Sequence, residues 1–550
     1  MSNRTTLGVT IAAVLACAAH STASAQTSEA QSLQELRNTV INLLDGLVQR
    51  GVITRDQAAA MVADAQSKAA ADAQAKADVD AAEKDAVRVT HVPQIVRDEI
   101  TKQVTAQVRS EVTSEVLAQA KEEKWGIPGA LPDWLDGIRL FGDMRFRTER
   151  DDQQMPRVPA DCEALGPDRC LLDFQAINEA GGIAVNDDSI YRHVTTDRFR
   201  TRLRLRAGIE ADVTNGITAV ARLSSGDARD PVSTNQTLGD YGDRFQIEID
   251  QAYLRFDAGS DAAVPWLTVL AGRNPNPFVS TDLVWDPDLG FDGLATTWRV
   301  GLGSAPTHTF LTVGAFPLQE LELTKDDKWL YGGQLGLDWT WAEGARFRLA
   351  AAYYYFDNIS GVRNPVLDSV LLDYTAPQFM QKGNTLFDIR NDLDPNTYLF
   401  ALAAEYHLAN ATALLELPIG GYRFYLTGDY VRNLGYDQQR VLALGSRTSD
   451  GQERSTGYQA EIGVGTASAG RRGNWRAFLA YKHLERDAVL DAFTDSDFNL
   501  GGTDAKGYVL RADWWFRDRA SVSLRYISTD SIDSLPVNVD VAMLDINATF

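Results

Sequence analysis

The sequence predicts an all-β transmembrane barrel of about 16 antiparallel strands, preceded by an α-helical N-terminal segment. Three observations support this prediction. From Gly137 onward apolar and polar residues alternate with a period of two, short turns alternate with long polar connections, and the last strand ends in Phe550. After residue 25 no apolar run reaches the roughly 18 residues that a membrane-spanning helix needs. We therefore expect strands to cross the membrane.

The first 25 residues form a predicted signal peptide. Arg4 provides the positive charge, an apolar stretch runs from Leu7 to Ala19, and Ala23-Ser24-Ala25 is an A-x-A cleavage site. A buried N-terminal helix is the alternative interpretation. Lipidation at Cys17 also stays open, because the residues before it resemble a lipoprotein motif.

Residues 26–134 are predicted to be helical and, after export, to lie in the periplasm. Apolar residues from Leu33 to Leu47 recur at helical spacing, and a capping box at Thr54–Gln57 opens a second helix. After an Ala-rich spacer, a third helix is expected over residues 94–124. Its apolar stripe has a residue at every fourth position: Val96, Ile100, Val104, Val108, Val112 and Val116. A stripe of this period wraps around the helix and favours a right-handed coiled coil, so we interpret the helix as an oligomerisation stalk; a helix on the barrel rim or in its mouth is the alternative.

Residues 137–550 are the predicted barrel, and residues 199–213 give its clearest strand. The odd positions are Phe199, Thr201, Leu203, Leu205, Ala207, Ile209, Ala211 and Val213, whereas the even positions include four arginines, Gly208, Glu210 and Asp212. A soluble β-sandwich also alternates, but it seldom has four arginines in a row on one face of a strand. A barrel with lipid outside and water inside requires such a split. Short connections such as Asn215-Gly216 alternate with long polar ones near 151–195, 226–244, 273–292, 357–396, 434–455 and 487–506. With the helical segment in the periplasm, the long loops would face outside.

The charge and the cysteines restrict the class of protein further. The chain of 550 residues has a formal net charge of −22, which argues against a nucleic-acid partner. Cys162 and Cys170 lie close together in a long polar segment of an exported chain, so we expect a disulfide between them. No clustered histidines accompany these cysteines, so a metal site is not expected, and no cofactor is implied.

The whole mature chain resembles the putative-porin family of Gram-negative bacteria, within the wider group of 16-stranded porins. The resemblance lies in Ile138–Arg147, Gln251–Phe256, Gly272–Pro277, Leu283–Asp288 and the closing strand Leu544–Phe550. It implies a diffusion channel in the outer membrane, surrounded by outer-membrane lipid and lipopolysaccharide. By analogy with porins it also implies a homotrimer, and a C-terminal Phe550 read by the barrel-assembly machinery.

Arginines dominate the predicted lumen face of the first two strands. Strand one provides Arg139, Arg145 and Arg147, and strand two provides Arg200, Arg202, Arg204 and Arg206. Because the strands are neighbours, these side chains would form one cationic wall that needs water, anions or facing carboxylates. The alternative is that some of them lie at the rims and hold loops.

The third outer loop, about Asn274 to Asp292, is the predicted counterpart of the arginine wall. In porins that this chain resembles, the third loop folds inward, and here it holds Asp282, Asp286, Asp288 and Asp292. Carboxylates facing arginines would create a transverse field that selects solutes by charge and dipole. A solvent-facing acidic loop is the alternative; the aspartate spacing also permits calcium, but it lacks the glycine and the closing Glu of an EF-hand. The arginines favour anions or carboxylated solutes, whereas acidic outer loops oppose that preference.

Other functional classes remain as alternatives. An outer-membrane enzyme would need His near Ser and a carboxylate, but His91, His193, His308, His407 and His483 are scattered, and no G-x-S-x-G motif occurs. We therefore do not expect an enzyme. A substrate-specific channel for anionic or carboxylated solutes is the closer alternative, and a tether that contacts peptidoglycan through the helical segment is the third.

Overall fold

The computed structural model describes residues 137–550 apart from short gaps, together with isolated residues between Asp56 and Gln74 that are helical. The gaps fall at 160–169, 183–189, 260–263, 304–306, 323, 342–343, 367–369, 393–396 and 447–451. The chain divides into two compact units, Met1–Leu117 and Ala118–Phe550. The predicted signal peptide, Cys17 and most of the helical segment, including residues 94–124, lie outside the described residues. Within the described part, no helix is long and apolar enough to cross a membrane.

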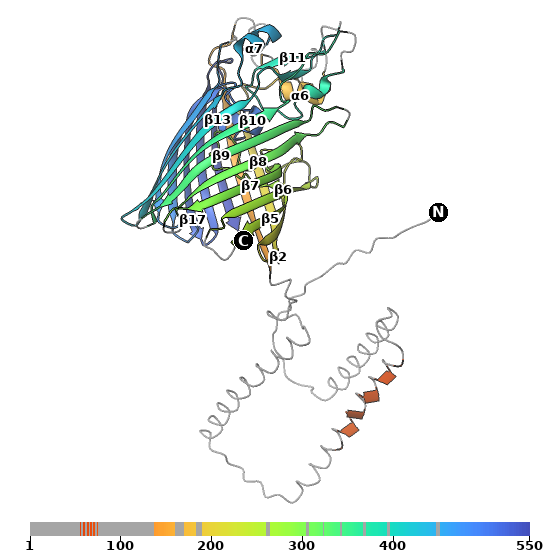
Figure 1. The fold of residues 1–550 in the computed structure, drawn as a ribbon, viewed down its shortest axis with the longest axis vertical. Coiled ribbons are helices and arrows are strands. Elements are labelled where there is room, and N and C mark those ends of the chain that lie inside the picture. The colour runs from red at the N-terminus through yellow and green to blue at the C-terminus, as the bar shows by residue number, and fades with distance from the viewer. Residues whose placement is uncertain are drawn as a thin grey trace, which may run out of the picture. The chain divides into compact units, whose positions relative to one another are not determined.

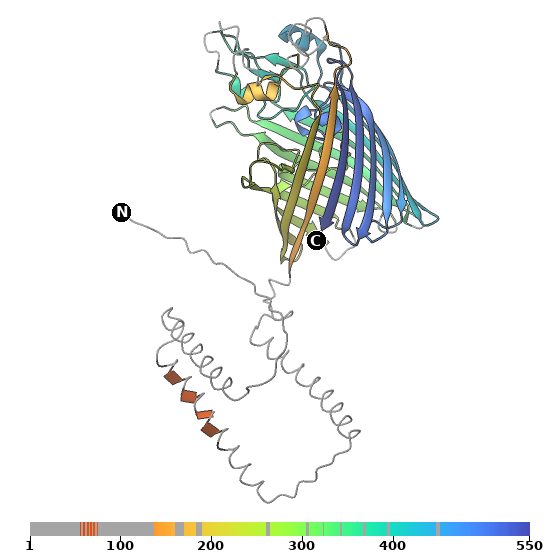
Figure 2. The same ribbon diagram turned by 180° about the vertical axis from the view of Figure 1, so that it is seen from behind.

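One antiparallel sheet closes on itself to form a barrel (Figures 1 and 2). Closure occurs because β1 pairs with both β2 and β19. The sheet has 17 strands, but β4 has only two residues and lies beside β2 where β3 has ended, so the barrel wall has 16 strands, as predicted. The strands of the wall are β1 (Ile138–Gln154), β2 (Arg198–Thr214), β3 (Ile217–Ser225) with β4 (Gln236–Thr237), β5 (Ile247–Ala258), β6 (Leu267–Asn274), β7 (Phe291–Gly301), β8 (His308–Gln319), β9 (Lys328–Thr340), β10 (Arg346–Asp357), β13 (His407–Ile419), β14 (Tyr422–Asn433), β15 (Thr456–Thr466), β16 (Trp475–Leu484), β17 (Ala505–Arg517), β18 (Ala520–Ser531) and β19 (Asn538–Thr549).

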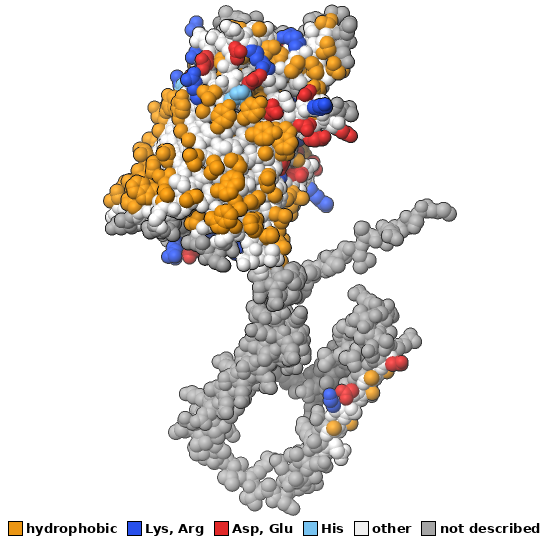
Figure 3. Space-filling view, viewed as in Figure 1, with side chains coloured by type: hydrophobic (Ala, Val, Ile, Leu, Met, Phe, Trp, Pro, Cys, Tyr) orange, Lys and Arg blue, Asp and Glu red, His pale blue; other side chains and the backbone are white. Residues whose placement is uncertain are grey.

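The alternation along each strand decides which side chains face out. On β1, the side chains of Leu140, Met144 and Phe146 are exposed on the outside of the barrel. Arg147 and Glu149, which have the opposite parity on the same strand, are buried. Figure 3 shows the resulting apolar cover on the outer face of the barrel. Because the period is two, this placement follows from the sequence once the inward face is known.

Outward-facing Tyr and Trp residues gather near both ends of the strands. One group lies toward the long loops: Tyr331, Tyr353, Tyr430, Tyr458, Tyr508 and Tyr526. The other lies toward the short turns: Trp298, Trp339, Tyr422, Trp475 and Trp514. Amphipathic rings at two levels of an apolar band are typical of a barrel that sits in a bilayer, where they occupy the two interfaces.

Turns at one end of the barrel alternate with loops at the other; six of the eight loops are the long polar stretches that the sequence predicts, whereas loops 4 and 8 are short. The turns include Asn215-Gly216, in which Gly216 has a φ of 76°. The connections at the loop end are called loops 1 to 8 here: residues 155–197, 226–246, 275–290, 320–327, 358–406, 434–455, 485–504 and 532–537. Small elements lie within them, namely α6 (Phe174–Glu179), the hairpin β11 (Leu386–Asp388) with β12 (Phe400–Leu402), α7 (Gln438–Leu444) and the 3-10 turns Asp373–Thr375, Asp491–Phe493 and Phe498–Leu500.

Two stretches depart from the regular alternation of the wall strands. The alternation slip near Ile249 is a bulge, because Arg222 pairs with Gln251 and Leu223 with Ile249, which leaves Asp250 as the extra residue. The stretch from Tyr398 to Leu417 is two strands, of which β12 lies in loop 5 and β13 in the wall. Cys170 is disulfide-bonded in the structure, but Cys162 lies outside the described residues, so their pairing stays a prediction.

The C-terminal residue completes the closure of the barrel. The backbone N–H of Gly142 donates to the carbonyl of Phe550 at 3.1 Å, and the N–H of Phe550 donates back at 3.0 Å. The Phe550 ring occupies the space that a side chain at Gly142 would need. Because glycine has no side chain, the ring can pack there on the outer face. The terminal strand signature therefore has a structural role in joining the first and last strands.

We expect Gly142→Val to weaken this closure. A valine would clash with the Phe550 ring and the carbonyl of Arg206, and overpacking of this kind costs about 1–3 kcal/mol. The measurement is the temperature at which the folded barrel converts to the slower-migrating unfolded form on a gel. Gly428→Val is the matched control, since Gly428 also lies on a wall strand and has open space around its Cα. Equal transition temperatures for both variants would contradict the assigned role of Phe550.

Candidate functional site

The arginines of β1 and β2 lie side by side on the inner face of the barrel. In the register between these strands, Arg145 is opposite Arg204 and Arg147 is opposite Arg202. Arg200 and Arg206 continue the row on β2, so six of the seven predicted arginines are brought together. Arg139 is not among them: it lies at the turn end, its side chain is 58% exposed, and it pairs with Glu210 at 3.3 Å.

Carboxylates on β1 interrupt this arginine row. Asp143 accepts from Arg204 at 2.9 Å and from Arg206 at 2.7 Å. Glu149 pairs with Arg200 and, at 3.6 Å, with Arg202. The wall is therefore a band of alternating charge and not a purely cationic surface. The sequence contained this signal, because both carboxylates share the inward-facing parity of Arg145.

Loop 3 (residues 275–290) folds into the barrel and is anchored by apolar contacts on one side. Phe278, Leu283 and Trp285 are buried. The ring of Phe278 lies 5.0 Å from that of Tyr354 on β10, and the ring of Trp285 lies 5.1 Å from that of Phe291 on β7. This packing fixes one face of loop 3 against β7–β10 and leaves its aspartates on the other.

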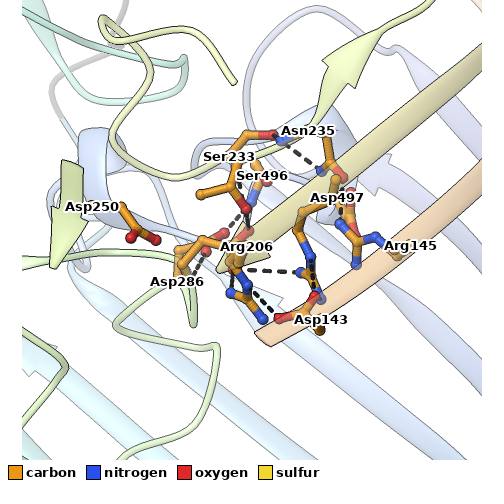
Figure 4. Close-up of polar contacts among 12 residues, drawn as sticks. Asp143, Arg145, Arg206, Ser233, Asn235, Asp250, Asp286, Ser496 and Asp497 are labelled. Atoms are coloured by element: carbon orange, nitrogen blue, oxygen red, sulfur yellow. Dashed lines mark hydrogen bonds and ion pairs between the residues drawn. The ribbon is translucent and has the colours of Figure 1, made fainter. Parts of the chain in front are cut away.

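Two of these aspartates reach basic side chains on other strands of the wall. Asp288 pairs with Arg206 at 2.9 Å and lies 3.6 Å from Arg204. Asp282 lies 3.3 Å from Lys482 on β16 and 3.8 Å from Arg525 on β18. Loop 3 thus contacts the wall at two separate places, and Figure 4 shows the first of these regions around Arg206 and Asp143.

The remaining two aspartates behave differently. Asp286 is buried beside loop 7, where it accepts the backbone N–H of Ser496 at 3.0 Å. Asp292 does not belong to the loop, since β7 begins at Phe291; its side chain is 52% exposed and pairs with Arg273 at 2.9 Å. The four aspartates therefore do not converge on one point, as a calcium site would require. Among the described residues, no group of three or more His, Cys, Asp or Glu side chains could hold a metal ion.

Loop 7 (residues 485–504) provides acidic residues that the sequence analysis missed. Asp497 pairs with Arg147 at 2.9 Å and with Arg525 at 2.7 Å. Asp495 pairs with Arg525 at 3.1 Å and lies 3.5 Å from Lys482. These ion pairs join loop 7 to the same cations that loop 3 reaches. The loop was expected as a long polar connection, but no periodic pattern in it indicates that it enters the barrel.

The electrostatic surroundings of the loop aspartates differ. Burial raises the pKa of Asp286, and the nearby charge of Asp495 raises it further. Burial would also raise the pKa of Asp288, but Arg204 and Arg206 lower it below its usual range. The loop carboxylates facing arginines are therefore held ionised, whereas the carboxyl at the junction of loops 3 and 7 favours its protonated form.

Loop 5 holds loop 7 in place through buried hydrogen bonds. The side-chain amide of Asn384 donates to the carbonyls of Arg486 and Val489 at 2.7 and 2.9 Å. Asp487 accepts from the backbone N–H of Thr385 at 2.8 Å and from the hydroxyl of Tyr406 at 3.0 Å. Since buried polar groups are costly when unpaired, this network fixes the position from which Asp495 and Asp497 reach the wall.

The fold defines a class of protein: a membrane β-barrel of 16 antiparallel strands. The chain belongs to the putative-porin family, whose sequence model matches residues 37–550. It is thus an outer-membrane porin, and its family points to a channel and not to an enzyme.

Three solved structures are similar to this chain at low sequence identity. OprB of Pseudomonas putida is 13% identical, with a TM-score of 0.41 over 78% of this chain and 97% of that chain. The outer membrane channel DcaP of Acinetobacter baumannii is 11% identical, with a TM-score of 0.38 over 75% of this chain and 97% of that chain. OmpT of Vibrio cholerae, in its trimer form, is 11% identical, with a TM-score of 0.37 over 75% of this chain and 99% of that chain. No curated protein sequence matches the chain.

Proposed function

We propose that this porin lets small hydrophilic solutes and ions diffuse passively through a lumen narrowed by loops 3 and 7. The observation that supports this most directly is the pairing of Asp288 on loop 3 with Arg206 on the wall strand β2, at 2.9 Å. Carboxylates on inward loops and arginines on the wall give a transverse field at the narrowest part, which orders water and selects solutes by charge. The arginines of β1 and β2 tilt this selection toward anions.

The orientation and the assembly are part of the same proposal. A signal peptide would be cleaved after Ala25, the helical segment would lie in the periplasm, and loops 1 to 8 would face outside. The every-fourth-residue stripe of helix 94–124 supports a stalk that joins the subunits of a homotrimer. Phe550 would be read by the barrel-assembly machinery, and lipopolysaccharide and outer-membrane lipid would surround the apolar band. Contact of the helical segment with peptidoglycan is a compatible further role.

The test is planar-bilayer conductance of the purified protein, with the reversal potential measured under a salt gradient. We expect stepwise openings with an anion preference that Arg202→Ala/Arg204→Ala abolishes, because two lumen charges are removed. Arg150→Ala/Arg471→Ala is the matched control, since it removes the same charge from exposed positions outside the lumen. A folded, heat-modifiable barrel without conductance would contradict the proposal and favour a tethering role.

A second candidate is a channel specific for anionic or carboxylated solutes. A cavity of about 960 Å³ at the loop end supports it, since six basic side chains line it against five aspartates. The basic residues are Arg192, Arg198, Arg200, Arg202, Lys382 and Arg486, and the aspartates are Asp151, Asp173, Asp197, Asp230 and Asp504. Burial and the neighbouring charge of Arg192 lower the pKa of Lys382 to about 7, and an anion bound beside it would favour the charged amine. Uptake into liposomes that saturates with one carboxylated solute would separate this specific channel from a general one.

A further inference from the structure

A second cavity, of about 840 Å³, lies between loop 3 and the wall strands β3 and β5 to β9, and residues of loops 2, 5 and 7 also line it. One part of its lining is acidic and comes from loop 2, β5, β7, loop 3 and loop 7: Asp227, Asp230, Glu248, Asp250, Asp288, Asp292 and Asp491. Another part is apolar and aromatic: Trp285, Leu289, Phe291, Phe316, Phe379 and Phe493. Its volume lies in the range of small-molecule sites, about 300–1,000 Å³.

The acidic part of this cavity carries more negative charge than its neighbours neutralise. Asp250 and Asp292 have arginine partners, Arg222 and Arg273, both at distances under 3 Å. Glu248 and Asp491, by contrast, form no ion pair with Lys or Arg in the part of the chain that the structure describes. Lys328 also lines the cavity, but its ammonium donates to the backbone carbonyl of Ala376 at 2.9 Å. A net negative lining attracts cations.

Asp491 gives the most specific indication of a ligand. Its side chain is 1% exposed, and its Oδ1 has no hydrogen-bond partner among the described residues. Its backbone, in contrast, is well bonded: the N–H donates to Asn384 at 2.8 Å, and the carbonyl accepts from Gln381 at 2.9 Å. Burial raises the pKa of the Asp491 carboxyl to about 7, so its ionised form is costly at neutral pH, and a bound cation would stabilise that form.

The aromatic part determines the kind of cation. The ring centre of Phe493, which follows Asp491 by two residues, lies 6.1 Å from that of Trp285 and 6.3 Å from that of Phe356. Flat rings beside a carboxylate suit an ammonium group on an apolar or aromatic body, since the rings attract cations through their faces. A small inorganic cation would leave this apolar surface without contact.

We propose that the cavity binds an organic cation, with its ammonium group at Asp491 and Glu248 and its apolar body against Trp285 and Phe493. This inference rests on the proposed function, because the site would lie along the route of solutes through the barrel. It names a substrate class, organic amines, that the arginine wall of β1 and β2 alone would not favour. The cavity thus gives the two sides of the lumen opposite charge preferences.

The test uses the full chain, folded in detergent, and isothermal titration calorimetry with benzylammonium. Benzoate, of similar size and opposite charge, and methylammonium, which lacks the ring, are the comparison ligands. We expect benzylammonium to bind most tightly, and Asp491→Asn to weaken it roughly tenfold or more, since a charge-assisted hydrogen bond is lost. Glu248→Gln tests the same site from β5, and Asp243→Asn, on an exposed part of loop 2, is the matched control.

The outcomes separate this inference from the channel itself. Equal binding of benzoate, or benzylammonium affinity unchanged in both Asp491→Asn and Glu248→Gln, would overturn the site. Bilayer conductance is measured in parallel on the same preparation. Open channels without benzylammonium binding would refute the cation site and leave the porin proposal standing, whereas binding without conductance would refute the porin proposal and support the site.

Discussion

Gly332→Val is expected to raise the single-channel conductance and to weaken charge selectivity. Gly332 lies on the inner face of β9, and the Phe278 ring of loop 3 occupies the space that a side chain at this position would need. Valine would clash with that ring and destabilise the packed conformation of loop 3 by about 1–3 kcal/mol. This lowers the ratio of packed to unpacked loop by roughly 5- to 150-fold. When Phe278 leaves its place, Asp282 and Asp288 move away from their basic partners on the wall, and the lumen widens.

The adjacent glycine provides the control for this prediction. Gly333 points outward on the same strand and has open space around its Cα, so Gly333→Val should keep the conductance of the wild type. Phe278→Ala should resemble Gly332→Val, because it removes the anchor itself and its edge contacts with Phe291 and Phe316. If Gly332→Val folds and conducts as the wild type does, loop 3 is not the part that narrows the lumen.

Most of the barrel could be predicted because each wall strand faces lipid on one side and the lumen on the other, so apolar and polar residues alternate along its sequence. The alternation from Phe199 to Val213 fixes which side chains of β2 face inward, and the slip at Asp250 appears as a bulge in the register. Whether the stretch after Tyr398 forms one strand or two could not be decided from its sequence, because loop 5 and β13 are both rich in apolar residues. There β12 packs within the loops, and its apolar residues cannot be distinguished from a wall strand by composition.

The candidate site could be predicted only in part, because it depends on contacts between distant segments. The arginines of β1 and β2 share a register, so their adjacency follows from neighbouring strands. Asp497, however, is 350 residues away from Arg147, and nothing near it in sequence indicates that pairing. The predicted loop includes Asp292, because loop bounds read from a sequence are uncertain by a few residues. In the structure loop 3 ends two residues earlier, so Asp292 lies on β7, where it pairs with Arg273.

Lys482→Met is expected to destabilise the junction of loops 3 and 7. Lys482 is 1% exposed, lies between Asp282 and Asp495, and has its ammonium 4.8 Å from the centre of the Phe498 ring. Removing it leaves carboxylates from two loops close together with fewer cations, and breaking a buried ion pair in this way costs about 3–5 kcal/mol. Proteolysis of loop 7 and rapid current fluctuations in bilayers would both increase.

The pH dependence distinguishes lost charge from lost packing in this variant. Burial raises the pKa of Asp495 in the wild type, whereas the Lys482 ammonium lowers the pKa of both Asp495 and Asp282, so both values rise when the ammonium is removed. A carboxyl whose folded pKa is raised penalises the folded state more as pH increases, so the difference between wild type and Lys482→Met should be large at pH 8 and shrink toward pH 5. Lys482→Arg keeps the charge and should show little of this difference, and Lys506→Met, an exposed lysine on β17, should show none. A stability loss in Lys482→Met that is the same at both pH values would mean that the lysine acts through its contact with Phe498 and not through its charge.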